Sequence, residues 1–248
     1  MRTLSAVVSL AALLTACGDS TAPPTGDPAP TASPDVGVTA LLPAEPTASP
    51  VADPAAPTPV PPVDGEPGGA ADWRKVASAD DAFNLSRLDQ AWRLGRAEAE
   101  DKGFATQVEA LGPLVDPDAG QADRLQPPPG PYRCRTLKLG TKNETGSALV
   151  VYPFFRCSVE LTPGGDLVLT KTTGSQRTRG LLYPDTDLRL VFVGAQAWGA
   201  DEAGFPRYGQ QLVRDQVGVL ERIGANRWRM VVPFPRVDST LEILELIR

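Results

Sequence analysis

The amino-acid sequence predicts a mainly β protein with a helical N-terminal segment, an α+β chain whose β part is a small antiparallel β-barrel. Three observations indicate this. From Tyr132 onward, short runs rich in β-branched and aromatic residues alternate with turn residues. A stretch with apolar residues at helical spacing precedes these runs. All 15 aromatic residues lie at or after Trp73, so the folded part begins there. A β-sandwich is the alternative arrangement of the same strands.

Residues 1–16 have the pattern of a bacterial lipoprotein signal peptide. Arg2 gives a positive start, and Leu4–Leu14 is an apolar run too short to cross a bilayer as a helix. Cys17 follows Leu-Thr-Ala, which resembles a lipobox, where the chain is cut before the cysteine and acyl chains such as palmitate are attached to it. An ordinary secretory signal is the alternative. Gly18, in place of an aspartate, favours the outer membrane, with the protein facing the periplasm.

Residues 17–72 are predicted to be the lipidated cysteine followed by a disordered tether. Between Gly18 and Asp72 there are 14 prolines, 8 acidic residues and no lysine or arginine. This composition cannot bury enough apolar surface to offset the entropy of ordering it. A proline-motif ligand is the alternative. From Trp73 onward, 23 basic residues face 22 acidic ones, so the folded part is not basic enough to predict a nucleic-acid partner.

Residues 73–130 are predicted to form a helical segment and a connector. A helix is expected over Ala79–Lys102, capped by Asp80 or Asp81 and ended by Gly103. One face of this helix carries apolar residues at helical spacing, and we expect this face to join the core. The residues of this face are Leu85, Leu88, Ala91, Trp92 and Leu94.

Residues 131–248 are predicted to form a disulfide-linked antiparallel β domain. Turn signals at Thr162–Gly165, Pro184–Asp187 and Gly224–Asn226 suit hairpins between its strands. The last candidate strand could instead be a helical turn. The eight candidate strands are Tyr132–Leu139, Leu149–Leu161, Leu167–Thr173, Gly180–Tyr183, Leu188–Val193, Val217–Ile223, Trp228–Pro233 and Leu241–Leu246.

The two remaining cysteines, Cys134 and Cys157, lie in predicted strands of a chain that carries an export signal. A structural disulfide is therefore expected between them, since exported proteins enter an oxidising compartment. A thiol redox pair is the alternative, although close Cys-x-x-Cys spacing is missing. These cysteines offer too few ligands for zinc, and the Asp116–Gly120 stretch lacks the later ligands of a calcium loop. No metal is expected.

Histidine is absent from the chain. The chain alone therefore cannot build Ser-His-Asp or Cys-His machinery, and its commonest general base is missing. We expect a non-enzymatic protein without a cofactor. An enzyme would need a cluster of Arg, Asp, Glu or Tyr in one cleft, which spacing in the sequence cannot reveal.

Four residues are candidates for ligand binding. Arg177 and Arg179 could clamp an anion, because guanidinium groups suit carboxylate and phosphate. The alternative is a structural pairing with an acid at the edge of the core. Arg214 belongs to the same hypothesis of an Arg–carboxylate network inside the barrel. Trp228, between two arginines, could stack on a ligand, or it could be a core residue with the arginines facing outward.

Several motifs resemble a known family. They include Tyr132-Arg-Cys-Arg, Tyr152-Pro-Phe-Phe-Arg-Cys, Thr173-Gly-Ser-Gln-Arg, Gly180-Leu-Leu-Tyr-Pro and Arg227-Trp-Arg. Together they resemble the core of a bacterial domain of unknown function, the 4893 family, over roughly Trp73 to the C-terminus. The resemblance implies no activity. The predicted barrel is also similar to small calycin-like envelope proteins, among them metalloprotease inhibitors with one disulfide.

We therefore expect a lipid-anchored cell-envelope protein that contacts the membrane through its N-terminal lipid. Its most favoured role is a non-enzymatic binding module for a small or lipid-like ligand, which predicts an accessible cavity in the barrel. The alternative is a protein-interaction module, such as a periplasmic protease inhibitor, whose partner is another envelope protein.

Overall fold

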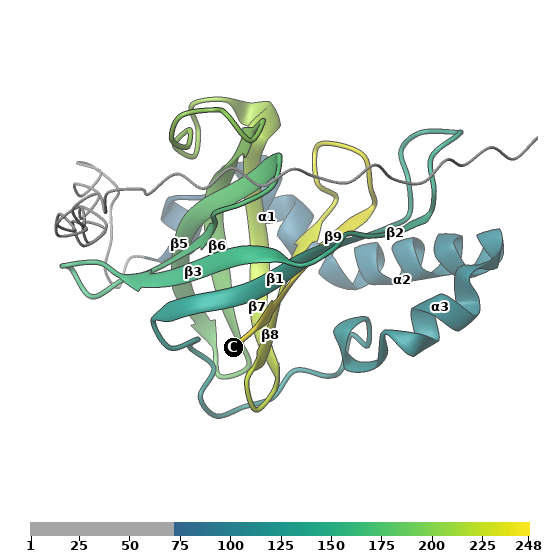
Figure 1. The fold of residues 1–248 in the computed structure, drawn as a ribbon, viewed down its shortest axis with the longest axis horizontal. Coiled ribbons are helices and arrows are strands. Elements are labelled where there is room, and N and C mark those ends of the chain that lie inside the picture. Colours follow the sequence, from purple (N-terminus) through teal and green to yellow (C-terminus); the bar gives the residue numbers. More distant parts are fainter. Residues whose placement is uncertain (1–71) are drawn as a thin grey trace, which may run out of the picture. The chain divides into compact units, whose positions relative to one another are not determined.

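The computed structural model describes residues 72–248, which form a closed antiparallel β-barrel preceded by short helices (Figure 1). The predicted signal peptide, Cys17 and the tether up to residue 71 lie outside the described residues. The barrel and both of its hydrophobic clusters are built from residue 73 onward. Residues 72–248 therefore contain a complete core, and we expect this part of the chain to fold on its own.

Nine strands are described, and eight of them close the barrel. Each strand pairs antiparallel with the next in the order β1-β3-β4-β5-β6-β7-β8-β9, and β9 pairs back onto β1. This closure confirms the predicted barrel and excludes the β-sandwich. The strands are β1 (Gly130–Leu139), β2 (Leu149–Val151), β3 (Phe155–Leu161), β4 (Leu167–Lys171), β5 (Gln176–Thr186), β6 (Arg189–Trp198), β7 (Asp215–Gly224), β8 (Arg227–Pro233) and β9 (Leu241–Ile247).

The predicted strand over Leu149–Leu161 was wrong in its continuity, because two strands occupy it. β2 pairs with the last three residues of β1, whereas β3 pairs with the first five. Pro153 lies in the gap, where its missing N–H cannot contribute to a ladder. Both strands therefore lie along one side of β1, one after the other. The final segment is a strand, β9, and not a helical turn.

The helices precede the barrel and cover part of its outer wall. They are the 3-10 helix η1 (Trp73–Lys75), α1 (Ala79–Ser86), α2 (Leu88–Ala99), the π-helical turn η2 (Glu100–Phe104), α3 (Ala105–Ala110) and the 3-10 helix η3 (Gly112–Leu114). A further 3-10 turn, η4 (Leu212–Arg214), lies in the long loop after β6.

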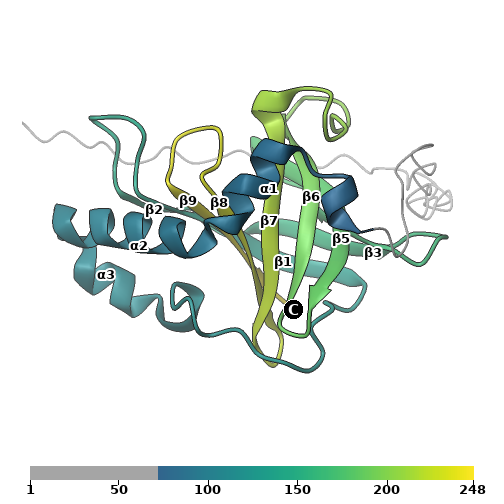
Figure 2. The same cartoon turned by 180° about the vertical axis from the view of Figure 1, so that it is seen from behind.

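The prediction of one continuous helix over Ala79–Lys102 was wrong at Arg87, whose backbone (φ −103°, ψ 24°) separates α1 from α2. The break lets α1 pack on β7 and β8 while α2 packs on β1, β8 and β9 (Figure 2). Tertiary packing therefore decides the break. Gly103 adopts φ 90°, a left-handed conformation that suits glycine, and ends the regular helix as expected.

The cap of α1 also differs from the expectation of Asp80 or Asp81. Ser78 is the last residue before the helix, and its Oγ accepts a hydrogen bond from the Asp81 N–H at 3.1 Å. The Asp81 carboxylate instead accepts hydrogen bonds from Ser78 and from Tyr208 in the loop after β6. Leu94 was wrongly placed in the core and is 49% exposed, because it lies off the α2 face that meets the barrel.

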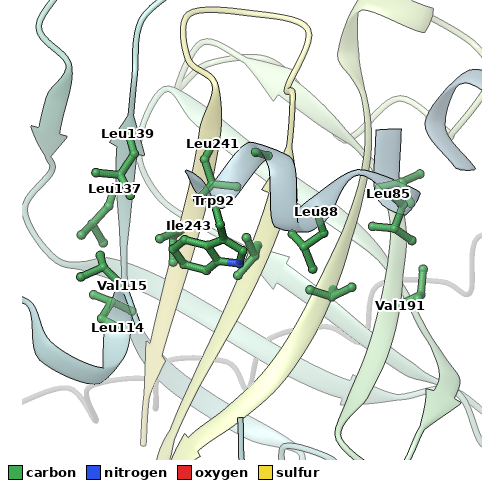
Figure 3. Packing of buried hydrophobic residues seen from close by; sticks show 14 of the residues in the cluster. Leu85, Leu88, Trp92, Leu114, Val115, Leu137, Leu139, Val191, Leu241 and Ile243 are labelled. Atoms are coloured by element: carbon green, nitrogen blue, oxygen red, sulfur yellow. The ribbon is translucent and has the colours of Figure 1, made fainter. Parts of the chain in front are cut away.

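Two hydrophobic clusters lie on the two sides of the barrel wall. The outer cluster joins the helices to outward-facing strand residues, and Trp92 of α2 packs there near Ile243 and Leu241 (Figure 3). The inner cluster fills the barrel itself and includes the Cys134–Cys157 disulfide, which confirms the predicted bridge. The alternation of side chains along each strand supplies both clusters from the same residue runs.

Candidate functional site

The barrel interior divides into an apolar half and a polar half. The apolar half lies toward the β3–β4, β5–β6 and β7–β8 turns and is filled by buried side chains. Phe192 projects inward near Gly180 and Gly194, which face each other across β5 and β6. A Cβ at either glycine would lie less than 3 Å from the Phe192 ring, so both positions need glycine. This half is therefore occupied by its own closely packed side chains.

The other half of the interior is polar, and we call it the polar end of the barrel. It lies toward the long loops that follow β1, β6 and β8. Charged and amide side chains from five strands are buried there, although buried charges and amides are uncommon, and β5 adds the buried Thr178 and the half-buried Gln176. The polar end comprises Thr136, Lys138, Lys171, Gln176, Thr178, Gln196, Gln216 and Glu242.

Lys138 is the best-neutralised charge of the polar end. Its Nζ donates hydrogen bonds to Asp238 Oδ2 at 2.9 Å and to Gln176 Oε1 at 3.2 Å. Glu242 Oε2 lies 4.0 Å away, on the neighbouring strand β9. Burial acts to lower the pKa of Lys138, but the carboxylates of Glu242 and Asp238 outweigh it and raise this pKa above 10.5.

Lys171 is buried with less compensation. Its Nζ donates a hydrogen bond to the Gln176 carbonyl oxygen at 2.6 Å, and the Phe155 ring centre lies 4.5 Å away. Among the described residues, no carboxylate lies within 4.0 Å of this ammonium group. Burial lowers the pKa of Lys171, Glu242 opposes the shift from a distance, and the positive charge of Lys138 adds to it.

Glu242 supplies the buried negative charge of the polar end. Burial raises its pKa, while Lys138, Lys171 and a hydrogen bond from Gln216 act to lower it. Thr178 Oγ donates to Gln216 Oε1 at 2.7 Å, so these side chains form a chain of polar contacts from β5 through β7 toward β9. The polar end therefore combines two cations, one carboxylate whose pKa is raised, and several neutral hydrogen-bonding groups.

The four arginine and tryptophan candidates do not converge on one site. Arg177 and Arg214 do come together, because both bind Glu202. Arg177 donates to the carbonyl oxygen of Glu202, and Arg214 donates to the Glu202 carboxylate. Arg179 lies on the outer wall, where it donates to Thr170 Oγ at 2.7 Å. The Arg–carboxylate contacts of these candidates therefore lie outside the barrel: Arg214 pairs with Glu202 in the loop after β6, and Arg179 lies 3.7 Å from Glu160 on the outer wall.

Trp228 occupies the apolar half of the barrel. Its indole N–H donates to the Leu125 carbonyl oxygen at 2.9 Å, and its ring packs edge-on against Tyr132. Arg227 and Arg229 point to the opposite side of β8. The structure therefore places Trp228 in the core with its flanking arginines outward.

The charged residues of the polar end were missed by the sequence reasoning, although a signal existed. Lys138 stands between two leucines, and Glu242 stands between Leu241 and Ile243. A single charge at an inward position of an apolar strand indicates a buried polar site when the strand belongs to a closed barrel. The closure brings these positions, distant along the chain, to one place.

Within residues 72–248, no group of three or more His, Cys, Asp or Glu side chains is arranged to hold a metal ion. No helix in that part of the chain has the length and apolar character needed to cross a bilayer. Asp116 makes turn contacts, accepting a hydrogen bond from the Asp118 N–H at 3.0 Å.

The fold and the polar end define a class of protein: a closed eight-stranded barrel, apolar inside at one end and charged inside at the other. Residues 73–246 match the model of a family described as a domain of unknown function (DUF4893), and the chain belongs to this family. The resemblance stated from the motifs is thereby confirmed. Comparisons with curated proteins and with solved structures found no match.

Proposed function

We propose that the protein is a non-enzymatic binding module that takes a small anionic molecule at the polar end of its barrel. The observation that carries this proposal is Lys171, a buried ammonium group that lies within 4.0 Å of no carboxylate in the described part of the chain. Burying a charge without a close partner costs stability. An anion bound beside Lys171 would supply the missing charge.

The surroundings of Lys171 indicate the chemistry of the ligand. A carboxylate or phosphate would accept hydrogen bonds from the ammonium group and from nearby amide and hydroxyl side chains. The rings of Phe155 and Tyr152 lie beside Lys171 and Lys138 respectively, and they offer apolar contact to the rest of the molecule. Because the apolar half of the barrel is filled, a short amphipathic acid fits this proposal better than a long acyl chain.

The thermal unfolding midpoint of residues 72–248 tests this proposal. Octanoate and inorganic phosphate are the anionic probes, and octanol is the neutral analogue. A ligand that binds only the folded state raises the midpoint. We expect a rise with at least one anion, no rise with octanol, and loss of the rise in Lys171→Met. Lys102→Met, which removes an exposed lysine of η2, is the matched control and keeps it. No response to either anion, or a full response in Lys171→Met, would contradict the proposal.

We also propose that the chain is held in the bacterial cell envelope by lipid on Cys17, at the outer membrane facing the periplasm. The support is the lipobox-like sequence together with the Cys134–Cys157 disulfide, a bond that persists in oxidising compartments. The test is fractionation of cells that make the full chain. Cys17→Ala is expected to leave the membrane fraction, and retention of this variant there would contradict the lipid anchor.

A second candidate function, contact with another envelope protein, is favoured by one surface feature. A hollow of about 540 Å³ outside the barrel is lined by the apolar Leu212, Val213 and Phe234 and by the polar Asn84, Lys142 and Arg236. Leu212 and Val213 are at least half exposed. A photo-crosslinking residue at Leu212 tests it, with exposed Leu188 at the other end of the barrel as control. One defined crosslinked protein from Leu212 alone supports this function, and equal products from both positions count against it.

A further inference from the structure

The outer wall around β1 carries a group of arginines that the polar end does not use. Arg133 and Arg135 point outward from β1, Arg156 from β3 and Arg227 from β8. In Figure 1, β1 and β3 lie on the near side of the barrel and α1 lies behind it. We call these four residues the arginine strip.

The arginine strip has an excess of positive charge. Glu245, which is fully buried, accepts hydrogen bonds from Arg135 and Arg227, each at 2.5 Å. Within the described residues, no carboxylate lies within 4.0 Å of Arg133 or Arg156. Four guanidinium groups thus share one carboxylate, while residues 72–248 contain equal numbers of basic and acidic residues.

The two uncompensated arginines face each other directly. Arg133 is the cross-strand partner of Arg156 in the β1–β3 ladder, and both are exposed. Like charges at directly opposite positions destabilise a sheet. The fold therefore keeps an unfavourable pair on an open surface, where an external anion would relieve the repulsion.

Apolar side chains lie next to these charges. The Phe154 ring lies under both β1 arginines, 4.5 Å from the Arg133 guanidinium and 4.9 Å from that of Arg135. Phe154 and Val151 are themselves more than one third exposed. Cations beside exposed aromatic and aliphatic groups suit a lipid interface, where phosphates meet the cations and apolar groups enter among the headgroups.

Two observations favour a lipid surface over a nucleic acid or a bound peptide. The guanidinium groups of Arg133 and Arg135 already pack against the Phe154 ring, so a stacking base would have to compete with them for this ring. Arg133 and Arg156 are exposed on the outer wall, and the arginine strip lines neither the hollow beside Leu212 nor the one beside Trp92. An extended anionic surface matches this shape.

We propose that the arginine strip, with Phe154 and Val151, is a membrane-contact face that binds anionic phospholipid headgroups. This contact is separate from the lipid proposed on Cys17 and from the polar end of the barrel. A second, protein-based attachment would hold one wall of the barrel against the bilayer. It would leave the loops at the polar end clear of that contact.

Vesicle sedimentation of residues 72–248 tests this proposal without any contribution from the N-terminal lipid. The probes are vesicles of phosphatidylcholine mixed with phosphatidylglycerol, and vesicles of phosphatidylcholine alone. The test variant is Arg133→Ser/Arg156→Ser. The matched control, Lys75→Ser/Arg93→Ser, removes the same charge from exposed positions on η1 and α2. Thermal unfolding of both variants verifies that each is folded.

We expect binding to the phosphatidylglycerol vesicles only, weakened by added salt. Each arginine contributes about fivefold to such binding, so the test variant should lose roughly 25-fold and the control less than twofold. Absence of binding by the unmodified protein would overturn the proposal. So would an equal loss in both variants, which would indicate net charge alone, or tighter binding to a single-stranded oligonucleotide than to the vesicles.

Discussion

Replacement of Arg229 by leucine is expected to have a large effect on folding, because this arginine joins the barrel to the connector before it. The Arg229 side chain is fully buried, and its Nε donates to Glu221 at 2.8 Å. Its two Nη groups donate to four backbone carbonyl oxygens in the segment 113–117. The guanidinium also lies 4.9 Å from the centre of the Trp92 ring in α2.

The magnitude follows from these contacts. Removing one partner of a buried ion pair costs about 3–5 kcal/mol, because the remaining charge is left without compensation. Glu221 keeps some contact with solvent, which reduces this cost, whereas the abandoned carbonyls add to it. We therefore expect Arg229→Leu to lower the free energy of unfolding by about 4 kcal/mol. Removing the stranded carboxylate as well, in Arg229→Leu/Glu221→Leu, should restore about 2 kcal/mol of this loss.

The assay is urea unfolding of residues 72–248, followed by circular dichroism and by tryptophan fluorescence. Arg156→Leu is the matched control, since this arginine is exposed and should change stability by less than about 0.5 kcal/mol. A loss below about 1 kcal/mol in Arg229→Leu would refute the reasoning. A double variant less stable than the single one would refute the role assigned to the stranded carboxylate.

Three other changes test separate parts of the structure. Burial lowers the pKa of Lys171 in the folded state, so between that lowered pKa and 10.5 the unfolded chain holds a proton that the folded chain has released. The stability of the unmodified protein relative to Lys171→Met should therefore rise with pH across this window, and a difference independent of pH would contradict this. Hydrogen bonds from Trp73 and Arg189 outweigh burial and lower the pKa of Asp185 below 3.8. The contribution of Asp185 to the free energy of unfolding, about 2 kcal/mol relative to Asp185→Asn, should be present at neutral pH and be lost as the pH falls through that lowered pKa. Equal acid sensitivity of the two proteins would argue against it. Gly194→Val would place a Cβ 2.2 Å from the Arg179 carbonyl oxygen. We expect the free energy of unfolding in urea to fall by about 3 kcal/mol, and a decrease of less than about 1 kcal/mol would mean that the strands can move apart there.

The strands and the disulfide could be predicted from the sequence because local patterns determine them. Alternation of apolar residues marked β6 and β8, and the turn residues between strands marked the hairpins. The two cysteines could be paired because few alternatives existed. The gap between β2 and β3 also had a local signal, because Pro153 lacks the N–H that a continuous strand would need, but one strand was predicted there.

Other features depend on contacts between distant segments. The break at Arg87 arises because α1 packs on β7 and β8 whereas α2 continues over β8 to β9 and β1, and no capping signal in the sequence marks it. The polar end requires barrel closure, which brings Lys138 of β1, Lys171 of β4 and Glu242 of β9 together. Sequence reasoning instead favoured neighbouring arginines such as Arg177, whose partners in the structure belong to a surface loop.

The most direct test of the binding proposal is native mass spectrometry of residues 72–248 purified from a bacterial periplasm, compared with the mass of the denatured chain. The proposal predicts an additional mass that is lost on denaturation, absent from Lys171→Met and retained by Lys102→Met. The identity of that mass would give the chemical class of the ligand. A native mass equal to the denatured mass in the unmodified protein, or a ligand retained by Lys171→Met, would contradict the assignment of the polar end as the binding site.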